Sequence, residues 1–81
     1  MLIALDYDKT YTADPELWDR FISDAQSRGH EVKILTMRYP SEPVEGLNID
    51  VVYTGRKAKY GAIPANIYID DTPQFLFQDA Q

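Results

Sequence analysis

The sequence predicts a single α/β domain with a short, mostly parallel four-stranded sheet. Four short apolar segments, each followed by a turn or helix signal, lie at residues 2–5, 32–35, 51–53 and 67–69. An amphipathic helical pattern separates the first two segments, and strands that alternate with helices are typical of parallel βαβ units. The chain has 81 residues, so residues 1–81 have room for one domain only.

The predicted helix has clear signals at both ends. Asp14 suits the capping position, Pro15 suits the first helical position, and Gly29 suits the residue just past the end. Apolar residues fall at helical spacing on one face, namely Leu17, Trp18, Phe21, Ile22 and Ala25. Strand, helix and strand over residues 2–35 therefore form a βαβ unit, for which we expect a right-handed crossover.

The two later connections are shorter. Residues 38–50 and 54–66 just reach the ~12 residues that a parallel crossover needs. Within the second connection we expect a short helix over residues 57–62.

Composition excludes several classes of function. The 8 basic and 13 acidic residues give a net charge of −5, which argues against broad binding to nucleic-acid backbones or membrane surfaces. The chain has no cysteine, which excludes disulfides, thiolate nucleophiles and cysteine zinc sites. No apolar run approaches the ~18 residues of a membrane span, and no signal-peptide pattern opens the chain, so we expect a cytoplasmic protein.

The polar residues of interest follow the predicted strands. They are Asp6 and Asp8, Thr36 and Arg38, Lys57 and Lys59, and Asp70 and Asp71. Ligands of open parallel sheets bind beyond the carboxyl ends of the strands. Neighbouring carboxylates repel one another unless a cation lies among them, and oxygen ligands favour Mg²⁺. A divalent ion, carboxylates and a lysine together indicate a phosphoryl-transfer site.

The same residues carry a resemblance to a known family. The run Asp6-Tyr7-Asp8-Lys9-Thr10 after an apolar strand resembles the DxDxT signature of haloacid dehalogenase (HAD) superfamily phosphatases. Thr36 is similar to that family's second motif, and Asp70-Asp71 to its acidic fourth motif. The resemblance covers residues 2–73. It implies a three-layer, Rossmann-like core with the strand order 4-1-2-3.

The resemblance also implies an activity, that of a Mg²⁺-dependent phosphohydrolase acting on phosphate monoesters. Asp6 would be the nucleophile that becomes an aspartyl phosphate, and Asp8 the general acid and base. Thr36 and a lysine would hold the phosphoryl oxygens. We favour Lys59 as this lysine, and Lys57 is its competitor.

The resemblance further assigns ligands. Magnesium would be held by Asp6, by the backbone carbonyl of Asp8, by Asp70, and by Asp71 directly or through water. Further contacts to the phosphate are expected from Thr10, Arg38 and Lys57, although Arg38 is equally suited to pair with a carboxylate.

Neither connection has room for the cap domain that family members usually carry. Capless members often act on large substrates, so a phosphorylated substrate here extends to proteins or nucleic-acid ends. The alternative is a module that binds Mg²⁺ or phosphate without catalysis; a receiver-like domain ranks last, because no aspartate ends the third strand. A four-stranded sheet also leaves two edges, and we expect a homo-oligomer to cover one of them.

Overall fold

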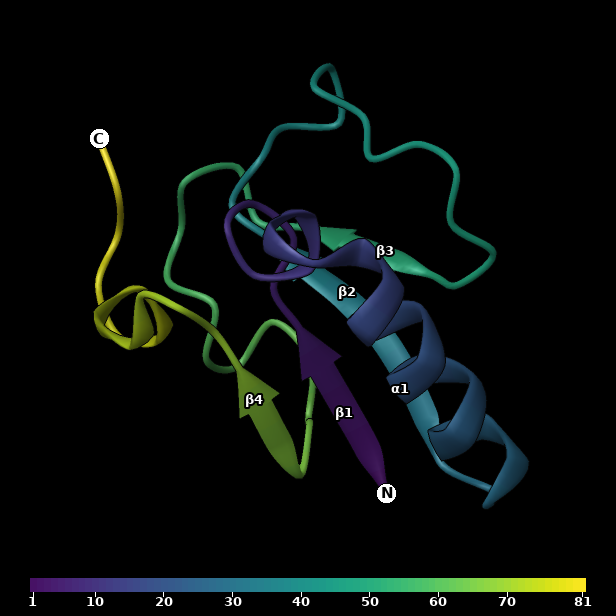
Figure 1. Cartoon of the computed structure of the whole chain (residues 1–81). Coiled ribbons are helices and arrows are strands. Elements are labelled where there is room, and N and C mark those ends of the chain that lie inside the picture. Colours follow the sequence, from purple (N-terminus) through teal and green to yellow (C-terminus); the bar gives the residue numbers. More distant parts are fainter.

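The computed structural model describes residues 1–81 and contains a four-stranded, all-parallel sheet with a single α-helix (Figure 1). The strands are β1 (Leu2–Leu5), β2 (Glu31–Thr36), β3 (Val51–Tyr53) and β4 (Ile67–Ile69). The helix α1 spans Pro15–Ser27, and the 3-10 turns η1 and η2 span Tyr11–Ala13 and Pro73–Leu76. The α/β class and the four strand segments agree with the prediction, and the sheet is parallel throughout rather than mostly parallel.

The two inner strands of the sheet are β1 and β2. The order is β3-β2-β1-β4, and the same neighbours read from the β4 edge give 4-1-2-3. In register, Leu5 of β1 lies opposite Ile34 of β2 and Ile69 of β4. The residues that follow β1 and β4 therefore leave the sheet side by side.

The helix begins and ends where its sequence signals lie. The side chain of Asp14 accepts a hydrogen bond from the Leu17 amide at 3.2 Å, and Pro15 opens the first turn. Gly29, with φ of 84°, follows the end of the helix in a left-handed conformation that glycine adopts freely. At 13 residues, α1 is too short and too polar to cross a bilayer, which needs about 20 apolar residues.

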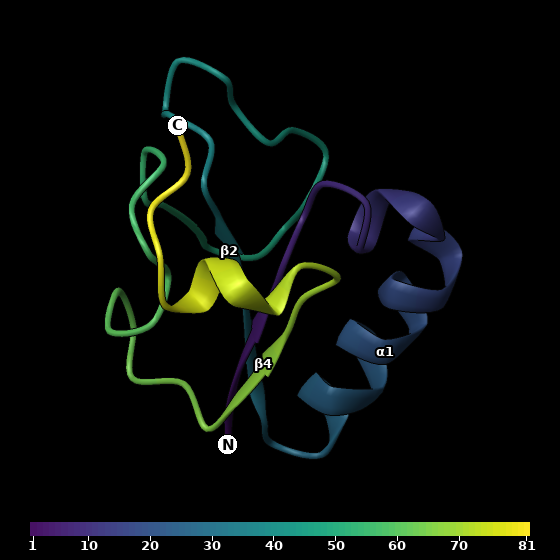
Figure 2. The ribbon, with the colours of Figure 1, turned by 90° about the vertical axis from the view of Figure 1, so that its left-hand side faces the viewer.

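Each face of the sheet has its own apolar core, because successive side chains of a strand point to opposite faces. On one face, Ile3, Leu5, Val32 and Ile34 pack against Ile22 and Ala25 of α1. On the other face, Ala4 and Leu35 pack against Ile63. Figure 2 shows α1 on one side of the sheet, with the connection before β4 and the C-terminal segment on the other.

The short helix expected over residues 57–62 is not formed. The amides of this segment donate to the C-terminal segment instead: Lys59 N to Phe75 O at 3.0 Å, and Tyr60 N to Leu76 O at 2.8 Å. The amide of Ala80 donates in return to Arg56 O at 2.8 Å. The second face is therefore covered by loops and the short 3-10 turn η2 rather than by an α-helix (Figure 2), and the three-layer, Rossmann-like core stays a prediction.

Candidate active site

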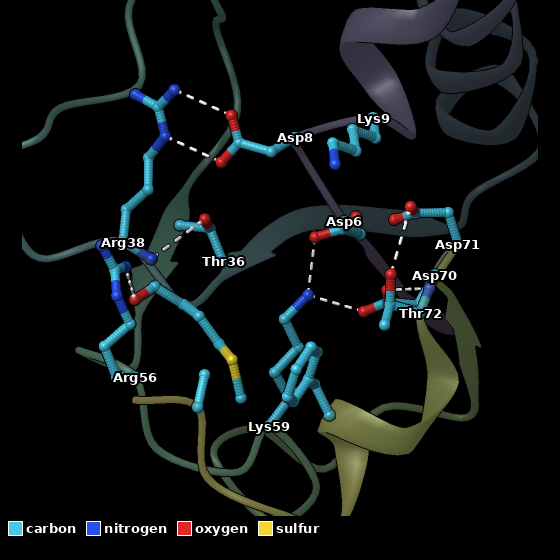
Figure 3. A pocket seen from close by; sticks show the side chains of 13 residues that line it. Asp6, Asp8, Lys9, Thr36, Arg38, Arg56, Lys59, Asp70, Asp71 and Thr72 are labelled. Atoms are coloured by element: carbon cyan, nitrogen blue, oxygen red, sulfur yellow. Dashed lines mark hydrogen bonds and ion pairs between the residues drawn. The ribbon is translucent and has the colours of Figure 1, made fainter.

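A pocket of about 250 Å³ lies beyond the carboxyl ends of the strands (Figure 3). The Asp6 amide donates to Ile69 O at 2.9 Å, so the pairing of β1 with β4 continues to the mouth of the pocket. This places the acidic residues after both strands together. The pocket is lined by Asp6, Asp8, Lys9, Thr36, Met37, Arg38, Arg56, Lys59, Asp70, Asp71, Thr72, Phe75 and Ala80.

The buried polar residues of the protein gather at this edge of the sheet. They are Asp6, Thr10, Thr36 and Lys59, each less than a tenth exposed. Burial of polar groups is costly unless they have partners. No buried side-chain nitrogen or oxygen of the protein lacks a hydrogen-bond partner, so the cluster is internally satisfied.

Burial distinguishes the two candidate lysines. The side chain of Lys59 is 4% exposed, and its Nζ lies 2.6 Å from both Asp6 Oδ1 and Asp70 Oδ2. The side chain of Lys57 is 76% exposed, lies outside the pocket and approaches Asp79 at 3.8 Å. The chain turns the Lys57 side chain outward, away from the pocket residues, and its expected phosphate contact stays a prediction.

Thr10 is buried behind the carboxylates and does not line the pocket. Its hydroxyl donates to Asp6 Oδ2 at 2.8 Å and lies 3.1 Å from Asp71 Oδ1, and it accepts from the Asp71 amide at 3.1 Å. The hydroxyl is thus bound to two carboxylate residues, and the expected phosphate contact of Thr10 stays a prediction.

Three carboxylates converge on a point where a metal ion can bind. Asp6, Asp70 and Asp71 each offer one oxygen atom, and these atoms all lie within 4.8 Å of one another. The three carboxylates and Lys59 leave a local formal charge of −3 + 1 = −2. A hard divalent cation such as Mg²⁺ fits both this charge and the all-oxygen donor set.

The surroundings shift the pKa values of Asp6 and Asp71 in opposite directions. Burial raises the pKa of Asp6 to about 6, although Lys59 opposes the change. Burial acts in the same direction on Asp71, but hydrogen bonds from Asp6, Thr10 and Thr72 outweigh it and lower the pKa of Asp71. Asp71 is therefore the stronger acid of the two.

Asp8 stands apart from the three converging carboxylates (Figure 3). Its Oδ2 and Oδ1 accept hydrogen bonds from Nε and Nη2 of Arg38 at 2.9 and 2.8 Å. The hydrogen-bonded guanidinium lowers the pKa of Asp8. Of the two interactions expected for Arg38, the structure contains the pairing with a carboxylate.

Thr36 ends β2 with its side chain at the pocket and is only 1% exposed. Its Oγ1 accepts from the Arg38 amide at 3.2 Å. The hydroxyl donates to no other protein group, so its hydrogen is free for a ligand in the pocket.

Several residues that line the pocket were not expected to do so. Lys9 directly follows Asp8, and Arg56 follows the turn Thr54-Gly55 after β3. Both residues have positive φ, at 67° and 70°. Thr72 directly follows Asp71, so its position was also indicated by the sequence. Phe75 and Ala80 reach the pocket because the C-terminal segment folds back, and the apolar run Phe75-Leu76-Phe77 is the sequence signal for its docking on the sheet.

No protein-family model, curated protein or solved structure matches this chain. The resemblance to HAD phosphatases therefore rests on the motif residues themselves and on the way they meet at one edge of the sheet.

Proposed function

We propose that this protein is a Mg²⁺-dependent phosphomonoesterase, a minimal HAD-type phosphatase without a cap domain. One observation carries the proposal: the buried Lys59 bridges Asp6 and Asp70, which follow two different strands, beside the third carboxylate of Asp71. A structural ion pair needs one carboxylate for one lysine. Three carboxylates around a single buried cation leave a charge that favours a second, divalent cation.

In the proposed reaction, an oxygen of Asp6 attacks the phosphorus atom in line with the ester bond. The new phosphorus–oxygen bond yields an aspartyl phosphate as the bond to the leaving oxygen breaks. Asp8, once it is released from Arg38 and protonated, gives its proton to that oxygen and then regains one from the water that attacks the intermediate. One water is consumed, an alcohol and inorganic phosphate are released, and Asp6 is regenerated.

The other pocket residues hold the transferred group. Thr36 donates its free hydroxyl hydrogen to a phosphoryl oxygen, and Lys59 neutralises charge on the phosphoryl group and on Asp6. Magnesium, when bound by Asp6, Asp70 and Asp71, supplies further stabilisation of the charge on the phosphoryl oxygens.

The charge of the pocket suits a phosphate dianion. Four carboxylates (Asp6, Asp8, Asp70, Asp71) face four cations (Lys9, Arg38, Arg56, Lys59), so the formal sum is −4 + 4 = 0. A bound divalent ion changes this sum to +2. A phosphomonoester dianion then restores neutrality, which supports phosphate esters as the substrate class.

The experiment that tests the proposal measures hydrolysis of p-nitrophenyl phosphate with and without Mg²⁺. We expect Mg²⁺-dependent turnover by the wild type and a loss of several orders of magnitude in Asp6→Asn, because the nucleophile is removed. Asp24→Asn is the matched control, because Asp24 pairs with Arg28 on the exposed side of α1. Turnover that is equal in Asp6→Asn and Asp24→Asn contradicts the assignment of the nucleophile.

A second candidate is a module that binds Mg²⁺ and phosphate without turnover. The bidentate pairing of Asp8 with Arg38 favours it, because that pairing keeps the proposed general acid ionised and occupied. Calorimetric binding of phosphate in the presence of Mg²⁺, together with no hydrolysis of any phosphomonoester, identifies this case.

A further inference from the structure

Two arginine side chains form one end of the pocket, opposite Asp70 and Asp71 (Figure 3). Arg38 comes from the loop after β2 and Arg56 from the loop after β3. In Figure 3 both lie on the far side of Lys59 from Asp70. The proposed chemistry gives this cationic end no function.

Arg38 presents a fork of donors to which Asp8 is bound. Its Nε and Nη2 are bound to the two oxygens of Asp8 at 2.9 and 2.8 Å. Such a fork matches the edge of any carboxylate or phosphate group. The side chain of Asp8 is 50% exposed and that of Arg38 is 30% exposed, so the pair is open to solvent and another anion can reach the guanidinium.

The guanidinium remains in place when Asp8 leaves it. Nη1 of Arg38 donates to the carbonyl oxygens of Glu42 and Pro43, each at 3.3 Å. The guanidinium also lies 5.0 Å from the centre of the Tyr7 ring, where a cation is attracted to the aromatic face. Neither interaction involves Asp8.

The pairing of Asp8 with Arg38 favours substrates that bring a second anion into the pocket. Both oxygens of Asp8 are held by Arg38, so Asp8 reaches a leaving oxygen only by giving up part of this pairing. At least one donor of Arg38 then loses its protein partner, which is unfavourable. An uncharged leaving group cannot neutralise the guanidinium, whereas an anionic one can.

Arg56 places a second cation at the same end despite an unfavourable backbone conformation. Its φ of 70° is disfavoured for any residue except glycine. Its Nη1 donates to Met37 O at 2.7 Å, its Nη2 pairs with the carboxylate of Glu42 at 3.2 Å, and its guanidinium lies 5.2 Å from the centre of the Tyr39 ring. A strained residue in a pocket is consistent with selection for its side chain.

We propose that Arg38, supported by Arg56, selects substrates that carry a second anionic group, a carboxylate or a phosphate, beside the leaving oxygen. The second anion takes the fork of Arg38 and thereby frees Asp8 for the leaving oxygen. This inference rests on the proposed function. A pocket of about 250 Å³, below the ~300–1,000 Å³ typical of drug-sized ligands, suits a small doubly anionic group or the end of a longer chain.

The test compares esters that differ in one anionic group. For the carboxylate, the pair is 2-phosphoglycerate and glycerol 2-phosphate, which share a carbon skeleton. For the phosphate, the pair is adenosine 3′,5′-bisphosphate and adenosine 5′-monophosphate. Values of kcat/KM are measured for the wild type, Arg38→Gln and Arg38→Lys, with Arg20→Gln as the control, because Arg20 lies on the exposed face of α1 and pairs with Glu16.

We expect the wild type to prefer the doubly anionic ester of at least one pair by about tenfold to a hundredfold, the range for hydrogen bonds between charged groups. Arg38→Gln should abolish this preference, Arg38→Lys should retain part of it, and Arg20→Gln should retain all of it. The pair that shows the preference identifies the second anion as a carboxylate or a phosphate.

Calorimetric binding of the same esters in the presence of Mg²⁺ gives a readout that does not need turnover. Equal affinities and equal kcat/KM for both members of both pairs overturn the role of Arg38, as does a preference that survives Arg38→Gln. Absence of hydrolysis by the wild type, with selective binding retained, instead refutes the proposed phosphatase activity and leaves the second anion site standing. Circular dichroism of Arg38→Gln separates either result from a loss of folding.

Discussion

Lys59 dominates the electrostatics of the pocket, because it is the one buried cation among several carboxylates. Its Nζ is bound at 2.6 Å to both Asp6 and Asp70, and neither carboxylate has another cation within ion-pair distance. Removal of one partner from a buried ion pair typically destabilises a protein by about 3–5 kcal/mol, because the remaining charge is left uncompensated.

We therefore expect Lys59→Met to lower the free energy of unfolding by about 3–5 kcal/mol in metal-free protein. This is a large part of the total stability of a domain of this size, roughly 4–12 kcal/mol at ~0.05–0.15 kcal/mol per residue. Lys57→Met is the matched control and should change stability by less than about 0.5 kcal/mol, since Lys57 is exposed. Urea unfolding of both variants measures the difference. Equal effects at the two positions would mean that burial at Lys59 has no energetic consequence.

Residue types at strand ends were predictable, but their pairings were not. The positions of Asp6, Thr36, Asp70 and Asp71 follow from strand boundaries that the sequence marks clearly. Thr10 donates a hydrogen bond to Asp6, and Lys57 points outward. Both depend on the directions that side chains take within irregular loops. Local sequence patterns carry no information on such directions.

At the level of elements, α1 is held in place by signals that lie within its own sequence. Asp14 caps the first turn by accepting from the Leu17 amide at 3.2 Å, and Pro15 has no amide hydrogen that needs a partner. The helix in turn buries Ile22 and Ala25 against the central strands. Its first turn follows η1 and the loop that carries Asp6 and Asp8, so the cap also supports the site.

We expect Asp14→Ala to cost about 1 kcal/mol of stability, the usual loss for a capping residue. For a domain of this size, this lowers Tm by roughly 4–8 °C. Asp14→Asn keeps an oxygen that can accept the Leu17 hydrogen bond and should leave Tm nearly unchanged. Thermal unfolding followed by circular dichroism measures both variants. A Tm for Asp14→Asn as low as that of Asp14→Ala would show that the charge, not the hydrogen bond, stabilises the first turn.

The connection before β4 has a structure that its local sequence did not predict. Residues 57–62 carry weak helical signals, yet the amides of Lys59 and Tyr60 donate to carbonyls of Phe75 and Leu76. These partners lie more than a dozen positions away, in the segment that folds back over the sheet. Hydrogen bonds to a distant segment of the chain thus take the place of the hydrogen bonds that a helix would form within itself. The same bonds fix the backbone of Lys59 and bring Phe75 to the pocket.

For the whole molecule, the uneven distribution of charge matters more than its total. The net charge is −5, and the acidic cluster of Asp6, Asp70 and Asp71 with Lys59 holds −2 of it in one small volume. The sheet is short and only one helix covers it, so the protein has few apolar contacts with which to offset this repulsion. Metal binding at the cluster should consequently stabilise the entire fold.

A ligand that binds only the folded state stabilises it by RT ln(1 + [L]/Kd), about 2.7 kcal/mol when its concentration is a hundred times Kd. We therefore expect Mg²⁺ to raise the Tm of protein freed of metal by a chelator, and the rise should grow with Mg²⁺ concentration. Asp71→Asn should lose most of this rise because it removes one of the three converging carboxylates, whereas Asp24→Asn on the surface of α1 should keep it. Potassium chloride at the same ionic strength controls for screening of the acidic surface. If potassium chloride raises Tm as much as Mg²⁺ does, or if Asp71→Asn responds like the wild type, the cations act by screening and the three carboxylates do not form a metal site.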